Sequence, residues 1–182
     1  MKPASNKREW PLSKVYGLLE PGPVLLLTTA HQGRANVMTQ SWHTLLEFEP
    51  PLVGCVVSGL GFSFTALRLT KQCVLNIPTA ELATQVVGCG NVSGAGFDKF
   101  SEFGLTPEPA SQVAAPLIQQ CYANLECRVV DTRLKNRYNF FVLEVVKAWV
   151  DPACKAPRTL HHCGYGVFRV AGETLTLPSR MP

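Results

Sequence analysis

Residues 58–71 place hydroxyl groups, glycines and cations where an apolar run gives way to helical spacing. Ser58 ends the run, two glycines follow, and Ser63 stands where a helix would begin. Free amides at a helix N-terminus bind phosphate when a hydroxyl and cations such as Arg68 and Lys71 lie nearby. Ser63 acting only as a helix cap, with Arg68 solvated, accounts for the same pattern.

A second candidate for ligand binding is the segment of residues 33–43. It interleaves polar and bulky side chains: Asn36, Met38, Thr39, Ser41 and Trp42. An extended strand of this kind offers hydrogen bonds and bulk to a flat heteroaromatic ligand. A plain amphipathic strand has the same pattern, so the segment alone does not separate the two interpretations.

The glycine-rich run of residues 88–96 has the spacing G-x-G-x-x-x-G, and no strand pattern precedes it. It therefore does not match a dinucleotide-binding fingerprint. We interpret it as a glycine-rich loop that places Lys99, with Asp98 and Ser101 around it, at the mouth of a site. The alternative for Lys99 is an ordinary solvated lysine.

Histidine and cysteine gather near the C-terminus, where His161, His162 and Cys163 are consecutive and Cys154 is close in sequence. Adjacent residues of a strand point to opposite faces, so this group predicts no metal site. His43 has no partner motif, and the sequence contains no GxSxG, HExxH or P-loop. Hydrolase and kinase functions have no support.

The chain has seven cysteines, widely spaced and without a CxxC pair, which argues against a disulfide scaffold or a zinc ribbon. Most stand in apolar contexts, where a reduced cysteine behaves as a small buried hydrophobe. Cys89, within the glycine-rich run, is the one expected to be exposed and reactive.

Length and composition indicate one globular domain of 182 residues, with 46% hydrophobic and 16% charged residues. Seventeen basic and thirteen acidic residues give a net charge of +4, and the basic ones are mostly scattered, so nucleic-acid binding is not indicated. No apolar run approaches the roughly 20 residues that cross a bilayer, and no secretory signal opens the chain. We expect a cytoplasmic protein that does not bind membranes.

Periodicity and turn residues predict a mainly β chain with a few helices. Strands are expected at residues 23–30, 35–48, 50–58, 73–78, 121–133 and 136–152, with two short strands in 164–178 around a Gly-Glu turn. Short helices are expected at residues 12–19, 63–72, 79–88 and 94–104. Without a regular βαβ alternation, a small antiparallel barrel with inserted helices is favoured over a doubly wound sheet.

Six runs of the sequence carry a family resemblance: residues 36–58, 63–78, 86–94, 98–107, 115–152 and 161–172. In this order they resemble the flavin reductase-like, FMN-binding split-barrel family, and within it the flavoredoxin-type members. The resemblance covers about residues 20–180. It implies a β-barrel with a few helices, namely a six-stranded antiparallel split barrel, and a homodimer with FMN near the subunit interface. Residues 1–19 would be a lead-in and residues 20–182 the domain.

The resemblance also assigns residues to the cofactor. Asn36 and Trp42 would touch the flavin ring and its ribityl tail, backbone amides around Met38 and Thr39 would meet the ring edge, and Ser63 would hold the phosphate. Lys99 would favour negative charge on the reduced ring. The full expected set is Asn36, Val37, Met38, Thr39, Ser41, Trp42, Ser58, Ser63, Lys99, Tyr138, His162 and Phe168. No catalytic acid or base and no metal ligand is expected.

The implied function is an FMN-containing oxidoreductase that accepts hydride from NADH or NADPH and passes electrons to another acceptor. The alternatives are an FMN electron carrier reduced by a redox protein partner, and a flavin-binding module without turnover. For the enzyme, the glycine-rich run and residues 162–168 would line the nicotinamide slot. A bulky side chain at Gly94 should then slow flavin reduction more than it weakens FMN binding.

Overall fold

The computed structural model describes residues 5–19 and 22–178, and one antiparallel sheet forms the body of this part of the chain. The spatial order of its strands is β3-β2-β6-β9-β10-β5-β4, with β1 paired to β10. The strands are β1 (Arg8–Glu9), β2 (Leu25–His31), β3 (Arg34–Gln40), β4 (His43–Glu47), β5 (Leu52–Val56), β6 (Gln72–Ile77), β9 (Ala123–Asp131) and β10 (Phe140–Val150). The predicted mainly β, antiparallel architecture is confirmed.

The sheet has eight strands where the resemblance implies six. The predicted strand over residues 35–48 is divided into β3 and β4 at Ser41 and Trp42, and the two-residue β1 joins β10. Across this corner, Gln40 at the end of β3 donates from Nε2 to the Val56 carbonyl of β5 over 2.8 Å. The side-chain bond ties together two strands that lie far apart in the strand order.

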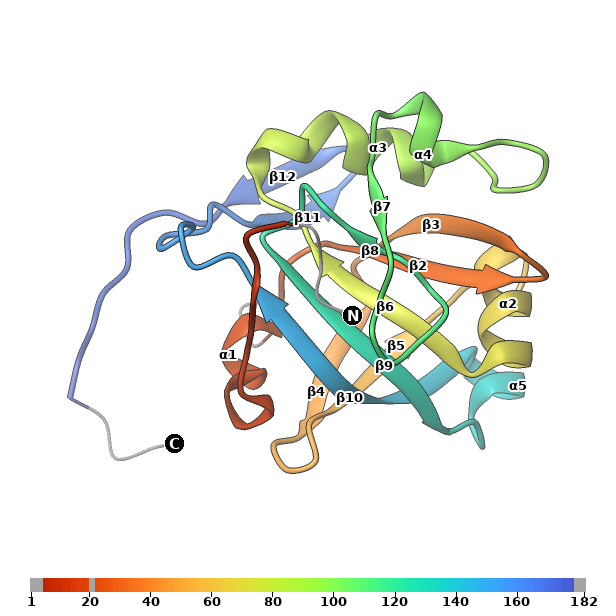
Figure 1. Cartoon of the computed structure of the whole chain (residues 1–182), viewed down its shortest axis with the longest axis horizontal. Helices are drawn as coiled ribbons and strands as arrows, with labels where there is room; N and C mark the ends of the chain where they lie inside the picture. The colour runs from red at the N-terminus through yellow and green to blue at the C-terminus, as the bar shows by residue number, and fades with distance from the viewer. Residues whose placement is uncertain (1–4, 20–21, 179–182) are drawn as a thin grey trace.

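The remaining elements are short. The helices are η1 (Leu12–Lys14), α1 (Tyr16–Leu19), α2 (Phe62–Thr70), η2 (Ala80–Leu82), α3 (Ala83–Asn91), α4 (Lys99–Glu102) and α5 (Lys135–Tyr138). Two strand pairs lie outside the main sheet: β7 (Pro107–Glu108) with β8 (Leu117–Ile118), and β11 (Leu160–Gly164) with β12 (Val167–Val170). Figure 1 shows α3, α4 and the β11–β12 hairpin at one end of the body, and β4 with α1 toward the other. None of the described helices has the length and apolar character needed to cross a membrane.

Two apolar clusters explain why β2 is a nearly continuous apolar run. Leu25 and Leu27 point into the main core inside the sheet, where Val15 and Leu19 of the lead-in also pack. Leu26 points the other way, into a second cluster beneath α3 and α4. Because β2 is covered on both faces, it shows no alternation of apolar and polar residues.

The predicted position of the turn between the two C-terminal strands is wrong. The turn lies at Tyr165 and Gly166 rather than at Gly172 and Glu173, so β12 pairs back onto β11. Gly164, Tyr165 and Gly166 all have positive φ, which a tight reversal needs and which glycine adopts without strain. Residues 171–178 follow β12 in no strand.

Candidate functional site

A cavity of about 340 Å³ lies beside β3, between the start of α2 and the end of α3; we call it the β3 cavity. β3 ends the strand order, so its outer edge has no strand partner among the described residues. Backbone N–H and C=O groups along such an edge can bind a ligand. Six of the predicted site residues line the cavity: Asn36, Met38, Thr39, Ser58, Ser63 and Lys99.

Asn36 and Ser63 are joined by a hydrogen bond although 27 positions separate them in the chain. Asn36 Nδ2 donates to Ser63 Oγ over 2.9 Å, and the two residues are only 4% and 2% exposed. Because Ser63 Oγ accepts this bond, its own hydroxyl proton remains able to bond a ligand in the cavity. The pair unites the two segments that sequence analysis singled out separately.

The N-terminus of α2 faces this cavity through Gly61, Phe62 and Ser63. Gly61 is the N-cap and makes no side-chain cap, so Ser63 is not the capping residue. Gly61 and Phe64 donate their amides to backbone carbonyls, so the Phe62 and Ser63 amides are the ones open to a ligand or to solvent, at the positive end of the helix dipole. This end of α2 is suited to an anion.

Arg34 is a cation that lies against the start of α2, and the sequence analysis did not identify it. Its guanidinium donates to the Gly94 carbonyl and lies 5.1 Å from the centroid of the Phe62 ring. Arg68 and Lys71, the cations proposed from sequence, lie in the last turn and at the C-cap of α2, away from its N-terminus. The sequence did contain a sign of this role for Arg34: its i, i+2 spacing to Asn36 places both side chains on one face of β3.

Lys99 is buried, with 4% of its surface exposed, so its interpretation as a solvated lysine is wrong. Its Nζ donates to the Cys89 carbonyl over 2.7 Å at the end of α3. Burial lowers the pKa of the Lys99 ammonium below its ordinary value. Asp98 caps α4 by accepting from the amides of Phe100 and Ser101, which fixes the start of the helix that carries Lys99.

The glycine-rich run is divided between the last turn of α3 and the loop that follows it. A Cβ at Gly94 would overlap the side-chain amide of Asn36, so any larger residue there requires Asn36 to shift. Gly90 faces Thr39 at ordinary contact distance, and Thr39 Oγ1 donates to the Val86 carbonyl over 2.5 Å. The run thus lets the end of α3 approach the outer edge of β3.

A second cavity, of about 250 Å³, lies next to the first and is called the hairpin cavity here. It is lined by Thr39, Gly90 and Asn91, which it shares with the β3 cavity, and by Ser41, His162 and Phe168. The rings of His162 and Phe168 lie 5.3 Å apart at 49°. The β11–β12 hairpin thereby brings two more predicted residues to the site.

Three predicted residues line neither cavity with their side chains. Val37 is fully buried in the cluster beneath α3, so only its backbone can face a ligand at β3. Trp42 and Tyr138 are 71% and 53% exposed. Trp42 follows Ser41 in the chain. Tyr138 precedes Asn139, whose carbonyl accepts a hydrogen bond from the Val57 amide, one residue before Ser58.

Cys89 is not the exposed thiol. It is 1% exposed, and burial raises the pKa of its thiol to about 11, with Lys99 opposing part of that effect. Cys163 is exposed, and all seven cysteines are free thiols. Within residues 5–19 and 22–178, no cluster of three His, Cys, Asp or Glu side chains could hold a metal ion.

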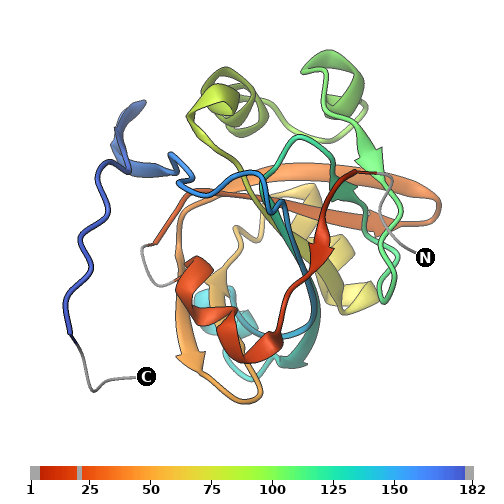
Figure 2. The same cartoon turned by 60° about the vertical axis from the view of Figure 1, so that its left-hand side comes forward.

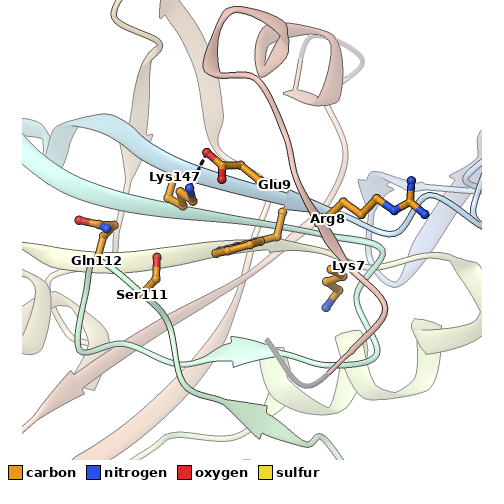
Figure 3. Close-up of a pocket in the computed structure, with 7 residues that line it drawn as sticks. Lys7, Arg8, Glu9, Ser111, Gln112 and Lys147 are labelled. Carbon is orange, nitrogen blue, oxygen red and sulfur yellow. Dashed lines mark ion pairs between the residues drawn. The ribbon is translucent and has the colours of Figure 1, made fainter. Parts of the chain in front are cut away.

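A third and larger cavity, of about 690 Å³, lies beside β10 and contains none of the predicted residues. Its charged groups mostly have partners within the chain. Lys147 pairs with Glu9 over 2.5 Å, and Lys7 Nζ donates to the Ile118 and Gln119 carbonyls. Figure 3 shows Arg8 directed away from the Lys147–Glu9 pair. These charges do not converge on one ligand position, so we place the candidate site at β3.

Comparison with known proteins covers most of the chain. The sequence profile of the flavin reductase like domain matches residues 18–170. An uncharacterized Escherichia coli protein, YddH, is 30% identical over 87% of this chain and 92% of its own length.

Solved structures give the same fold. An FMN-binding domain of a flavin reductases-like enzyme from Shewanella baltica superposes with a TM-score of 0.88 at 26% identity, over 96% of this chain and 98% of its own. The flavoredoxin of Desulfovibrio vulgaris superposes with a TM-score of 0.79 at 20% identity, over 86% and 90% of the two chains.

Proposed function

The chain belongs to the flavin reductase-like domain family, and we propose that it is an FMN-binding oxidoreductase. In this proposal it accepts hydride from NADH or NADPH and passes electrons to another acceptor. The observation that carries it is the convergence of Asn36, Ser63 and Lys99, from three separate segments, on the β3 cavity. We further propose residues 20–182 as the functional domain, with residues 1–19 as its lead-in and the cytoplasm as its location.

The residues at β3 fit FMN. The N-terminus of α2, the Ser63 hydroxyl and Arg34, which lies against the Phe62 ring, would hold the phosphate. The outer edge of β3 around Met38 and Thr39 would meet the polar edge of the ring. Ser41, Ser58, His162 and Phe168 would line the remaining surface.

FMN, when bound, would supply the redox chemistry, so no acid or base of the chain is required. Lys99 would be the electrostatic element of the site, because a buried ammonium held by the Cys89 carbonyl keeps its position without the ligand. A fixed positive charge favours the form of the flavin that carries negative charge. The hairpin cavity would admit a second planar group next to the flavin, as a nicotinamide donor requires.

A homodimer is part of the proposal, and exposed apolar side chains around the site support it. Leu60 at the β3 cavity and Tyr165 beside the hairpin cavity are fully exposed, and Trp42 is 71% exposed. Large apolar side chains gathered around a cavity mark an interaction surface. Trp42 and Tyr138 would meet the flavin at this surface.

The decisive experiment is anaerobic mixing of the FMN-loaded protein with NADH and with NADPH, followed at the flavin absorbance band. We expect one or both nucleotides to bleach the band within seconds. If neither does although dithionite does, the protein is an electron carrier of the flavoredoxin kind and needs a protein donor. A protein that takes up no FMN would contradict both functions.

A further inference from the structure

Residues 171–178 form an extended arm beyond β12. Figures 1 and 2 both show the arm running clear of the body. Ala171 donates to the Thr159 carbonyl, but no residue from 172 to 178 has a hydrogen bond to another described residue. Leu175 and Leu177 are 81% and 68% exposed, and their i, i+2 spacing places both on one face of an extended chain. The arm therefore offers unpaired backbone and an apolar face.

A matching groove of about 290 Å³ lies beside β4, and we call it the β4 groove. It is lined by Leu19, Gly22, His43, Thr44, Leu45, Leu46, Glu47 and Phe48. β4 is the last strand in the spatial order, so among the described residues its outer edge has no strand partner. Leu46 and Phe48 are 46% and 48% exposed there.

The arm and the β4 groove are complementary in form and polarity. A strand added to a free sheet edge gains main-chain hydrogen bonds, and alternate side chains enter the pockets beside that edge. Leucines two residues apart lie about 7 Å from each other, a spacing that would place both over the apolar lining of the groove. Eight extended residues reach about 26 Å, enough to cross to a neighbouring molecule.

We propose that the arm, residues 171–178, of one copy of this protein binds in the β4 groove of a second copy. In both views the arm lies on the same side of the body as α1 and β4. Two copies facing each other on that side would exchange arms reciprocally, which closes the assembly as a symmetric dimer. The inference rests on the proposed homodimer and not on FMN. Trp42 of the proposed dimer surface directly precedes His43, the first residue of β4, so the arm exchange would extend that same surface.

The first test compares the dimer equilibrium of the wild type with that of Leu175→Ser/Leu177→Ser, by analytical ultracentrifugation. We expect the dissociation constant to rise by about 100-fold or more, because two apolar contacts are lost from each arm. Thr174→Ala/Thr176→Ala changes the opposite face of the arm and should leave the constant unchanged. A monomeric wild type, or equal dissociation for both variants, would overturn the proposal. Thermal melting and FMN uptake, measured separately, report on fold and cofactor.

The second test is disulfide trapping in a Cys163→Ser background, which removes the exposed native thiol. A chain carrying Leu177→Cys is mixed with a chain of different mass carrying Leu46→Cys, and the linked products are weighed. We expect the disulfide between the two different chains to be the main product. In the control, Ser101→Cys on α4, which is distant from β4 in Figure 1, takes the place of Leu46→Cys, and no linked pair should form. If only a single chain carrying both Leu177→Cys and Leu46→Cys becomes linked, the arm folds back on its own groove and the exchange is refuted.

Discussion

Ser63→Ala tests the phosphate end of the proposed FMN site, because the change removes one hydroxyl and little else. In the structure Ser63 Oγ accepts a hydrogen bond from Asn36 Nδ2 over 2.9 Å and keeps a proton to donate. A hydrogen bond to a charged phosphate is worth about 1.5–3 kcal/mol. The dissociation constant for FMN should therefore rise by roughly 10- to 150-fold.

Riboflavin separates this effect from a general disturbance, since it lacks the phosphate. Its affinity should stay nearly constant in Ser63→Ala, so the preference for FMN over riboflavin falls by the factor expected for FMN alone. The measurement is titration of flavin fluorescence against each protein. Thr70→Ala is the matched control, because the Thr70 hydroxyl donates to the Ala66 carbonyl within the last turn of the same helix.

The same substitution also affects the fold. Asn36 Nδ2 loses its acceptor, and a buried amide without a partner costs about 1–3 kcal/mol, so the protein without cofactor should melt at a lower temperature. An equal loss of affinity for FMN and riboflavin would show that Ser63 acts through the fold. Unchanged affinity for both would refute the phosphate site at α2.

Three further changes test other parts of the site. Gly94→Ala should weaken FMN binding more than it slows flavin reduction, because the new Cβ overlaps the Asn36 amide; the sequence alone predicted the opposite order. Gly172→Ala is the control in the same titration, since a Cβ at Gly172 would meet nothing within 4 Å. Lys99→Met should lower the flavin reduction potential by about 20 mV, which corresponds to about 1 kcal/mol for the loss of one ammonium charge beside the ring. An unchanged potential and affinity in dye-coupled titration would remove Lys99 from the site. Thiol labelling of the native protein should modify Cys163 first and Cys89 only after denaturation, and a fast phase that persists in Cys163→Ser would contradict the burial pattern.

Local pattern alone was sufficient for much of the architecture and for several site residues. The apolar run of residues 23–30 predicted a buried strand, and both faces of β2 are indeed covered. Glycines and serines before residue 63 predicted a helix start beside a ligand, and α2 begins at Phe62 facing the β3 cavity. These features depend on neighbours within one turn or one strand, so the sequence carries them directly.

The tertiary structure decided which groups meet, because burial and partnership depend on segments far apart in the chain. Lys99 is a buried cation only because the end of α3 presents the Cys89 carbonyl to it, and Arg34 rather than Arg68 lies at the start of α2 because β3 ends the sheet there. Cys89 is buried because the helix that carries it packs against β3. The alternation in residues 173–177 is that of a strand, yet a strand needs a partner edge, and within the described residues of this chain none reaches it.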